Sequence, residues 1–404
     1  MKSQANTRES DDAPRAGNWL TATLAALAAY FVSIGIARFA YSPLIPALIE
    51  EQWFSATDAT YLGAANLAGY LIGAISGKWM GGRVAHHRLL GLVMLVVSAS
   101  LFASMFPVSF AWYFAWRFIS GYCGGTVMVL AATLILPRVP QRRLGLAGGL
   151  MFTGVGGGIA LSGMLVPFLV EIGLTETWFV LGMISLILTV VAYPFWPRNT
   201  RTQPDNMPGL VYSSAHAFTF PLVMLYLTYG LTAMALTAHM VFLVDFVARD
   251  LDLGLVTGGR IWIAFGLGAM IGPLSAGALA GRIGFRCALH ALLVIMLLSI
   301  GMIIINQQTP TLFVSAFVVG ALVPGVVPLI AGFVHELTGT NQSQNKTAWS
   351  LATVSFAVGQ AIAAYAYAAI YAARAEYMAV FQVATGIAAL AFLINIIGAV
   401  RQNR

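Results

Sequence analysis

"GALAGRIGFR" (residues 277–286) repeats the pattern of "GKWMGGRVAHHR" (residues 77–88). Each stretch has a glycine, three further residues, a second glycine and then an arginine, at the start of a short basic loop. The first glycines, Gly77 and Gly277, are 200 residues apart in a chain of 404. Because this distance is about half of the chain, the spacing predicts two related halves.

The composition indicates what each half contains. Of all residues 59% are hydrophobic and 9% are charged, whereas a soluble domain has roughly 25% charged residues. A run of about 18 apolar residues can cross a bilayer as a helix. Twelve such runs are present, at 19–48, 60–80, 89–107, 110–136, 145–170, 178–197, 218–247, 259–280, 287–306, 311–334, 348–372 and 377–400. The sequence therefore predicts an all-α polytopic membrane protein with twelve transmembrane helices in two pseudo-symmetric six-helix bundles.

A polar stretch separates the sixth run from the seventh. It contains Pro204, Pro208 and several turn-forming residues, which is typical of a linker. The predicted organisation is a cytoplasmic N-terminal tail (1–18), a first bundle (19–197), a cytoplasmic linker (198–217) and a second bundle (218–404).

The basic residues predict the orientation in the membrane. With the N-terminus in the cytoplasm, 16 of the 21 Lys and Arg residues fall on the cytoplasmic side. The opposite orientation leaves only Arg249 and Arg374 clearly inside. The positive-inside rule thus predicts two cytoplasmic termini and a multi-pass protein of the cell inner membrane. It also explains the net charge of +7 without a nucleic-acid partner.

The repeated loop resembles the Gly-x-x-x-Asp-Arg-x-Gly-Arg signature of the Major Facilitator Superfamily. The second copy matches at Gly277, Arg282, Gly284 and Arg286, and the first copy matches at Gly77 and Arg83. Gly281 and Gly81 stand where the signature has aspartate. This departure removes the carboxylate on which the superfamily's charge-relay latch between the halves depends.

Four further stretches are similar to the YbfB/YjiJ-type branch of that superfamily: "GIARFAYSPLIPAL" (35–48), "GVGGGIALSGMLVP" (154–167), "HMVFLVDFVARDL" (239–251) and "FGLGAMIGPLSAG" (265–277). The resemblance covers the length of the chain. It implies the superfamily fold and secondary transport by alternating access. Most of the branch has no assigned substrate, so the resemblance indicates a class and not a cargo.

Arg38 is the first candidate for a functional residue. A charge in the middle of a bilayer costs roughly 2.5–3.5 kcal/mol on insertion scales, so such residues usually face a cavity. Helical spacing places Tyr30, Arg38 and Tyr41 on one face. The planar guanidinium suits a carboxylate or phosphate. The alternative is a structural arginine that bonds carbonyls freed by Pro43 and Pro46, or that reaches outward to the interface.

Two amides extend this predicted substrate site, and both are the polar centres of otherwise apolar runs. Asn66 lies in the second run and Gln360 in the eleventh. The hypothesis is that Arg38, Tyr30, Tyr41, Asn66 and Gln360 bind an anionic or polar small solute. Core packing is the alternative for the aromatic residues.

Three residues are candidates for coupling or gating. The resemblance implies such a role for Arg117, which Gly121 follows at the family's spacing; an interfacial anchor is the alternative. His239 is of the residue type that titrates near neutrality, and the alternative is a histidine bonded between helices. Asp245 lies near an outer edge, where we expect an ion pair with Arg260.

Other functions fit the sequence less well. No nucleophile elbow, paired-histidine zinc motif or nucleotide-binding loop is present, which argues against an enzyme, a metal site or a cofactor. The internal repeat favours a transporter over a channel. The prediction is a monomeric secondary transporter of a small molecule, driven by the proton gradient. The alternative is proton-linked efflux of lipophilic compounds.

Overall fold

The computed structural model describes residues 18–198, 217–339 and 341–402, so nearly all of the expected tail and linker lie outside the described residues. Its helices in chain order are α1 (Asn18–Tyr30), η1 (Phe31–Ile36), α2 (Tyr41–Glu50), α3 (Ala56–Arg83), α4 (His86–Ala103), α5 (Phe110–Ile135), η2 (Leu136–Arg138), η3 (Gln141–Arg143), α6 (Leu144–Val170), α7 (Leu174–Ala192), η4 (Tyr193–Phe195), α8 (Phe220–Asp245), η6 (Phe246–Asp250), α9 (Gly254–Ile283), α10 (Phe285–Ile305), α11 (Thr309–Thr338), α12 (Gln342–Arg374) and α13 (Tyr377–Gln402).

Eleven helical segments of the described chain are long and apolar enough to cross a membrane. The first of them joins α1, η1 and α2 into one span, Trp19–Glu50. The helix α3 is not among the eleven, although its 28 residues make it as long as the others. It packs along α5 and α12 and completes the predicted set of twelve. The chain is therefore a multi-pass membrane protein.

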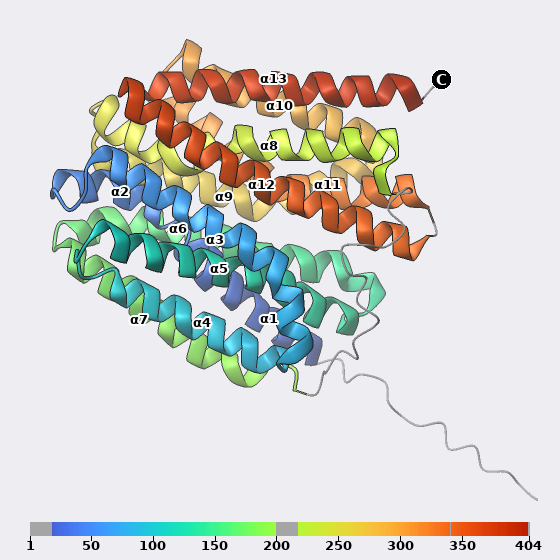
Figure 1. The fold of residues 1–404 in the computed structure, drawn as a ribbon, viewed down its shortest axis with the longest axis horizontal. Helices are drawn as coiled ribbons and strands as arrows, with labels where there is room; N and C mark the ends of the chain where they lie inside the picture. The colour runs from blue at the N-terminus through green and yellow to red at the C-terminus, as the bar shows by residue number, and fades with distance from the viewer. Residues whose placement is uncertain (1–17, 199–216, 340, 403–404) are drawn as a thin grey trace, which may run out of the picture.

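The helices form two halves with the same internal packing. The elements α1–α7 lie together on one side of the molecule and α8–α13 on the other (Figure 1). In the first half α3 packs on α5 and α4 on α7; in the second, α9 packs on α11 and α10 on α13. These pairs correspond in chain order, which is the predicted pseudo-symmetry.

Rows of glycine explain how closely these helices approach. On α3, a Cβ at Gly69 or Gly73 would lie 2.0 Å from a carbonyl oxygen of α5. On α9, a Cβ at Gly268 or Gly272 would lie within 2.0 Å of a carbonyl oxygen of α11. Only a hydrogen side chain fits these contacts, and such rows are a common means of association between membrane helices.

The two halves meet mainly through four pairs of elements: α6 with α9, α3 with α12, α2 with α8 and α2 with α9. In contrast, α1 packs on α5, α6 and α7 of its own half. We call the end of the molecule with the α2–α3 loop the α2 end, and the end where α1 begins and α13 ends the terminal end (Figure 1). The first span thus joins the halves at the α2 end.

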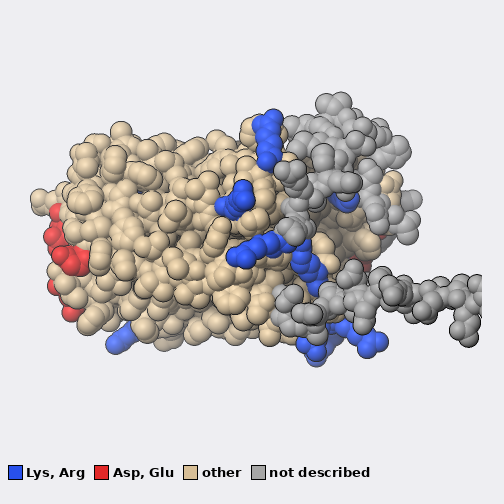
Figure 2. Space-filling view, turned by 90° about the horizontal axis from the view of Figure 1, so that it is seen from below, with Lys and Arg blue, Asp and Glu red and all other residues tan. Residues whose placement is uncertain are grey.

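Charged side chains are distributed unevenly between these ends. The visible Asp and Glu side chains gather at the α2 end, and most visible Lys and Arg side chains lie nearer the terminal end (Figure 2). The α2–α3 loop, next to Glu50 and Glu51, is at the acidic end (Figure 1).

The first and seventh spans are not regular α-helices. In the first span a π-helical segment, η1, and a turn at 37–40 separate α1 from α2. In the seventh span α8 ends in the π-helical segment η6. The prediction that Tyr30, Arg38 and Tyr41 share one helix face was wrong, because that spacing holds only for an uninterrupted α-helix.

Candidate functional site

Arg38 lies in the turn between η1 and α2 and points across to the other half. Its Nη2 donates a hydrogen bond to Oε1 of Gln360 on α12, at 3.0 Å. Its guanidinium carbon lies 4.9 Å from the ring centroid of Tyr70 and 5.1 Å from that of Phe39. The aromatic rings and the amide oxygen partly offset the loss of water around the charge. The acceptor is thus a side chain of the other half and not a backbone carbonyl freed by Pro43 or Pro46, as the structural alternative required.

A second arginine, Arg117 of α5, lies beside the same turn. It is 3% exposed, so it is not an anchor in an aromatic belt at the membrane surface. Its Nη1 donates to the carbonyl oxygen of Ala37 at 2.7 Å. Its guanidinium carbon stacks 4.1 Å above the ring of Tyr41. The irregular backbone after η1 therefore supplies a carbonyl acceptor to a buried charge.

These residues surround a small cavity where the two halves meet. Its volume of about 20 Å³ exceeds the roughly 10–15 Å³ that one water requires, so in this closed arrangement it accommodates only a small polar group and must widen for a larger ligand. The described residues that line it are Arg38, Phe39, Tyr41, Ser42, Gly63, Asn66, Leu67, Arg117, Met240 and Val241. Two of these are basic and none is acidic, so the cavity is electropositive.

Two polar atoms at this cavity have no hydrogen-bond partner in the described chain. They are Oδ1 of Asn66 and Nε of Arg117, and both residues are buried. The Asn66 amide nitrogen donates to the carbonyl oxygen of Arg117 at 3.1 Å and to Oγ of Ser120 at 3.2 Å. Buried polar atoms without partners are rare and call for an explanation, such as a bound molecule.

The halves are closed over this cavity on its α2 side. The Ser42 hydroxyl on α2 donates to the carbonyl oxygen of Met240 on α8, at 2.5 Å. The amide nitrogen of Gln360 also lies 3.8 Å from the Met240 sulfur. The contact between Gln360 and Met240 lies within the second half, whereas the bonds from Ser42 to Met240 and from Arg38 to Gln360 tie the first half to the second.

Tyr30 is separate from this cluster. Its hydroxyl donates to the carbonyl oxygen of Met128 at 3.2 Å, and its ring packs edge-on against Phe152. The Tyr41 hydroxyl instead donates to the carbonyl oxygen of Ala59 at 2.9 Å and its ring lies under Arg117. The structure thus brings Arg38, Tyr41, Asn66 and Gln360 together and places Tyr30 in the packing of the first half.

His239 is fully buried inside the second half. Its Nε2 lies 2.8 Å from Oγ of Ser315, and the Ser315 hydroxyl donates to the carbonyl oxygen of Ser299 at 2.6 Å. Because that hydroxyl proton is already used, Ser315 accepts a hydrogen bond from Nε2–H of His239. The ring packs edge-on against Phe381 and does not line the cavity.

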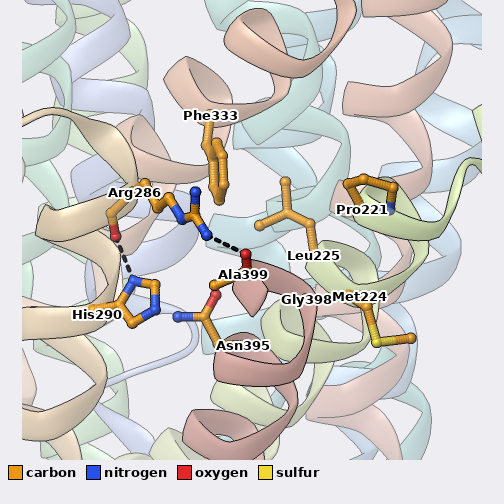
Figure 3. Close-up of a pocket in the computed structure, with 9 residues that line it drawn as sticks. All are labelled: Pro221, Met224, Leu225, Arg286, His290, Phe333, Asn395, Gly398 and Ala399. Carbon is orange, nitrogen blue, oxygen red and sulfur yellow. Dashed lines mark hydrogen bonds between the residues drawn. The ribbon is translucent and has the colours of Figure 1, made fainter. Parts of the chain in front are cut away.

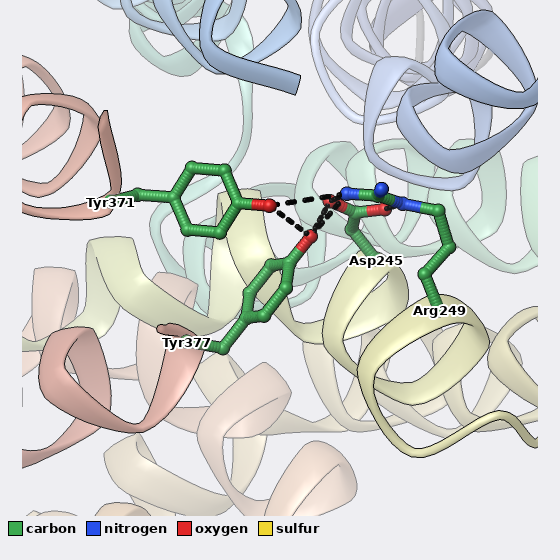
Figure 4. A network of polar contacts seen from close by, with 4 residues as sticks. All are labelled: Asp245, Arg249, Tyr371 and Tyr377. Atoms are coloured by element: carbon green, nitrogen blue, oxygen red, sulfur yellow. Dashed lines mark hydrogen bonds and ion pairs between the residues drawn. The ribbon is translucent and has the colours of Figure 1, made fainter. Parts of the chain in front are cut away.

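Asp245 forms an ion pair with Arg249, one turn further along the seventh span, and the expected pair with Arg260 was wrong. The pair is bidentate, with Nε to Oδ1 at 2.5 Å and Nη2 to Oδ2 at 2.8 Å. The hydroxyls of Tyr371 and Tyr377 converge on it from α12 and α13 (Figure 4). Tyr377 donates to Oδ2 of Asp245, and Tyr371 donates to the Tyr377 oxygen at 3.1 Å. Arg260 is exposed.

The two copies of the loop signature have different surroundings. In the first copy Gly77 is buried against α5 and Arg83 lies 3.5 Å above the Trp79 ring. In the second, Gly277 and Arg282 are exposed, and Gly284 has a φ of +80°, which favours glycine. Arg286 donates to the carbonyl oxygen of Ala399 near the end of α13.

Arg286 also lines a second small cavity, which lies entirely within the second half (Figure 3). His290 and Asn395 face it beside Arg286, and apolar residues of α8, α11 and α13 complete it. His290 Nδ1 is already bonded to the carbonyl oxygen of Arg286, at 2.7 Å. Because this cavity does not lie between the halves, it lacks the placement that alternating access requires of a substrate site.

Sequence reasoning missed several residues of the central site. Tyr70 follows Asn66 by one helical turn on α3, a spacing that could have indicated it. Ser42 and Met240 act through bonds between the halves, and no sequence pattern indicates such contacts. In the described part of the chain no group of three or more His, Cys, Asp or Glu side chains is placed to bind a metal ion.

In the described residues, twelve helical spans in two repeated bundles, with a polar cavity between them, define a secondary transporter of the Major Facilitator Superfamily (MFS) class. A family model described as "Uncharacterised MFS-type transporter YbfB" matches residues 30–396. The chain belongs to this YbfB-type family of MFS transporters, as its sequence predicted.

One solved structure similar to the chain is a crystal structure of a single-residue mutant of the nucleoside transporter NupG. The TM-score is 0.73 and the sequence identity is 12%, over 93% of this chain and 99% of that one. At this identity the similarity shows the fold alone. A comparison with curated proteins finds no match.

Proposed function

We propose that the protein transports a small organic anion, which binds in the cavity between the two halves. The observation that carries this proposal is that Arg38 and Arg117 line one small cavity with no acidic residue among its described lining. Burying a charge without a partner is costly, and the aromatic rings and carbonyl oxygens offset only part of that cost. A bound anion would neutralise the site and supply acceptors to both guanidinium groups.

The arrangement of the halves supports transport by alternating access. The α2 end is held shut by bonds across the interface, whereas α1 packs within its own half toward the terminal end. We propose that both termini are cytoplasmic in the cell inner membrane, because basic residues concentrate toward the terminal end. On this orientation the structure is closed to the outside, and rocking of the halves would open the α2 end.

Proton coupling is a further part of the proposal, and Asp245 is the proposed proton-binding group. It is 1% exposed, whereas every other carboxylate of the described residues is at least partly exposed. It lies on α8, which also contacts α2 of the other half, so movement of the halves changes the surroundings of this helix. His239, in contrast, is enclosed by bonds and rings of the second half.

Thermal stability of the purified protein tests the substrate class. The samples are wild type, Arg38→Gln and the charge-matched control Arg260→Gln, each with acetate, lactate, succinate, phosphate, choline and tetraphenylphosphonium. A ligand at about 100 times its Kd adds roughly 2.7 kcal/mol to the free energy of unfolding. We expect anions to stabilise wild type and Arg260→Gln but not Arg38→Gln. Equal stabilisation of all three proteins by the two cations would instead support efflux of lipophilic compounds.

A further inference from the structure

The Asn66 amide at the central cavity has a defined orientation. The carbonyl oxygen of Arg117 can only accept a hydrogen bond, so the atom 3.1 Å from it must be the amide nitrogen. The Ser120 hydroxyl donates toward the carbonyl oxygen of Ala37, at 3.5 Å, and so accepts from the same amide nitrogen. Both amide protons are thereby used, and Oδ1 is left as a buried acceptor without a partner.

A donor with no partner is present at the same cavity. Nε of Arg117 is buried and unpartnered, although Nη1 of the same guanidinium is bonded to Ala37. Thus Asn66 and Arg117 leave one acceptor and one donor unused, and they do not satisfy each other. A ligand that fits this cavity needs an acceptor for the guanidinium and a donor for the amide oxygen.

The size of the cavity restricts how far apart these two ligand groups can be. Asn66, Arg38 and Arg117 line the same cavity of about 20 Å³, so a ligand group bonded to Oδ1 lies beside the guanidinium groups that would hold the anionic group. The donor must therefore be attached next to the charged group of the ligand. A hydroxyl on the carbon beside a carboxylate satisfies this requirement.

The charge of the cavity favours a neutral donor over a cationic one. An ammonium group beside a carboxylate would also reach Oδ1, but it would be repelled by Arg38 and Arg117, with no acidic residue among the described lining to compensate. A hydroxyl donates the same bond without that repulsion.

We propose that the substrate is a small hydroxycarboxylate whose hydroxyl, next to the carboxylate, donates to Oδ1 of Asn66. This inference rests on the proposed function, because it assumes that the two arginines bind the carboxylate. Asn66 is then the residue that distinguishes hydroxylated acids from their deoxy analogues. A site built around a substrate hydroxyl rejects an analogue without it, because the protein atom then stays unpaired.

Calorimetric titration of the purified full-length protein with matched acids tests the inference. The pairs are glycolate with acetate, lactate with propionate, and malate with succinate, and L-alanine is the ammonium analogue of lactate. We expect wild type to bind the preferred hydroxy acid at least about tenfold more tightly than its deoxy partner. In Asn66→Leu this ratio should fall to about one, with the Kd of the deoxy acid changed by less than about threefold.

Ser120→Ala is the matched control, because it removes one partner of the amide nitrogen and keeps Oδ1, so the preference should persist. If Asn66→Leu does not fold, the ratios of Kd between the deoxy and hydroxy acids in the wild type test the inference by themselves. If the wild type binds both members of every pair equally, the assignment of a substrate hydroxyl to Oδ1 is wrong, and a single water would be a sufficient partner for this atom. The proposal that the substrate is an anion would remain intact. Tighter binding of L-alanine than of lactate would also overturn it. If no carboxylate binds wild type, the proposed function fails as well.

Discussion

Arg38 and Gln360 are 322 positions apart in the chain and are joined by a hydrogen bond of 3.0 Å between Nη2 and Oε1. The arginine belongs to the first span and the glutamine to the eleventh, so the bond crosses from one half of the molecule to the other. The same guanidinium that is proposed to bind the substrate therefore also helps to hold the α2 end closed. A substrate carboxylate that binds the Arg38 guanidinium would compete with Oε1 of Gln360 for it. Substrate binding would therefore weaken the bond that holds the α2 end closed.

Gln360→Leu should therefore favour opening of the α2 end. A hydrogen bond to a charged group contributes about 1.5–3 kcal/mol, so its loss should raise the ratio of open to closed molecules by roughly ten- to a hundredfold. Spin labels at Glu51→Cys and Asp252→Cys, in a background with Cys123→Ala and Cys287→Ser, report this ratio as a distance distribution. Both labelled positions are exposed.

Thr353→Val is the control for this measurement, because the Thr353 hydroxyl bonds only within α12, to the Trp349 carbonyl oxygen at 2.9 Å. It should leave the distances of the parent unchanged. An unaltered distribution in Gln360→Leu would show that the bond between Arg38 and Gln360 does not hold the α2 end closed.

Uptake should fall strongly when a larger side chain replaces a glycine at the close contact between α6 and α9. A Cβ at Gly163 would lie 2.6 Å from the Gly259 carbonyl oxygen, and a Cβ at Gly259 would lie 2.5 Å from that of Gly163. Gly163→Val would push the halves apart, and its uptake into proteoliposomes should fall at least about tenfold. Gly145→Val, on the same helix with nothing within 4 Å, should keep uptake near that of wild type. Normal uptake by Gly163→Val would mean that this contact yields during transport.

The spans and their repetition were predictable because they depend on composition and on period, which a single sequence contains. The glycine rows were also predictable, since Gly69 and Gly73 lie one turn apart on an otherwise apolar helix. The site was only partly predictable. Arg38, Asn66 and Gln360 could be identified as polar residues in apolar runs. Their grouping with Arg117 depends on the π-helical segment η1, which no residue pattern predicted.

The partner of Asp245 shows a second limit of sequence reasoning. Both Arg249 and Arg260 lie near the outer edge of the membrane in the sequence, and the prediction chose the more distant one. The continuation of α8 into η6 keeps Arg249 within one turn of the carboxylate, whereas Arg260 is on the next span and exposed. An i, i+4 pair was therefore the better expectation wherever the helix continues.

Tyr377→Phe should destabilise the second half. The Tyr377 hydroxyl bonds the Asp245 carboxylate and accepts from Arg249, so its loss should cost about 1.5–3 kcal/mol in the free energy of unfolding. Tyr371→Phe removes only weaker bonds, at 3.1 Å to Tyr377 and 3.4 Å to Arg249, and should cost about 0.5–1.5 kcal/mol. Denaturant titrations in detergent compare the two variants. Equal costs would show that the tyrosines act by packing and not through the carboxylate.

Asp245→Asn should separate exchange from proton-driven accumulation. If Asp245 binds the coupling proton, the asparagine variant behaves as a permanently neutral carrier. It should exchange labelled substrate across proteoliposomes at a rate within about threefold of wild type, yet fail to concentrate substrate when a pH gradient is applied. The readouts are counterflow and gradient-driven uptake of the same labelled acid, measured on one preparation.

His239→Gln is the comparison that decides between the two candidate proton carriers. Glutamine has no titratable group and can still donate to Ser315, so the variant should retain both exchange and accumulation. If His239→Gln loses accumulation while Asp245→Asn keeps it, the proton is carried by the histidine. The ion pair between Asp245 and Arg249, with its two tyrosines, would then serve to fix α8 against α12 and α13, and the coupling path would run through the interior of the second half.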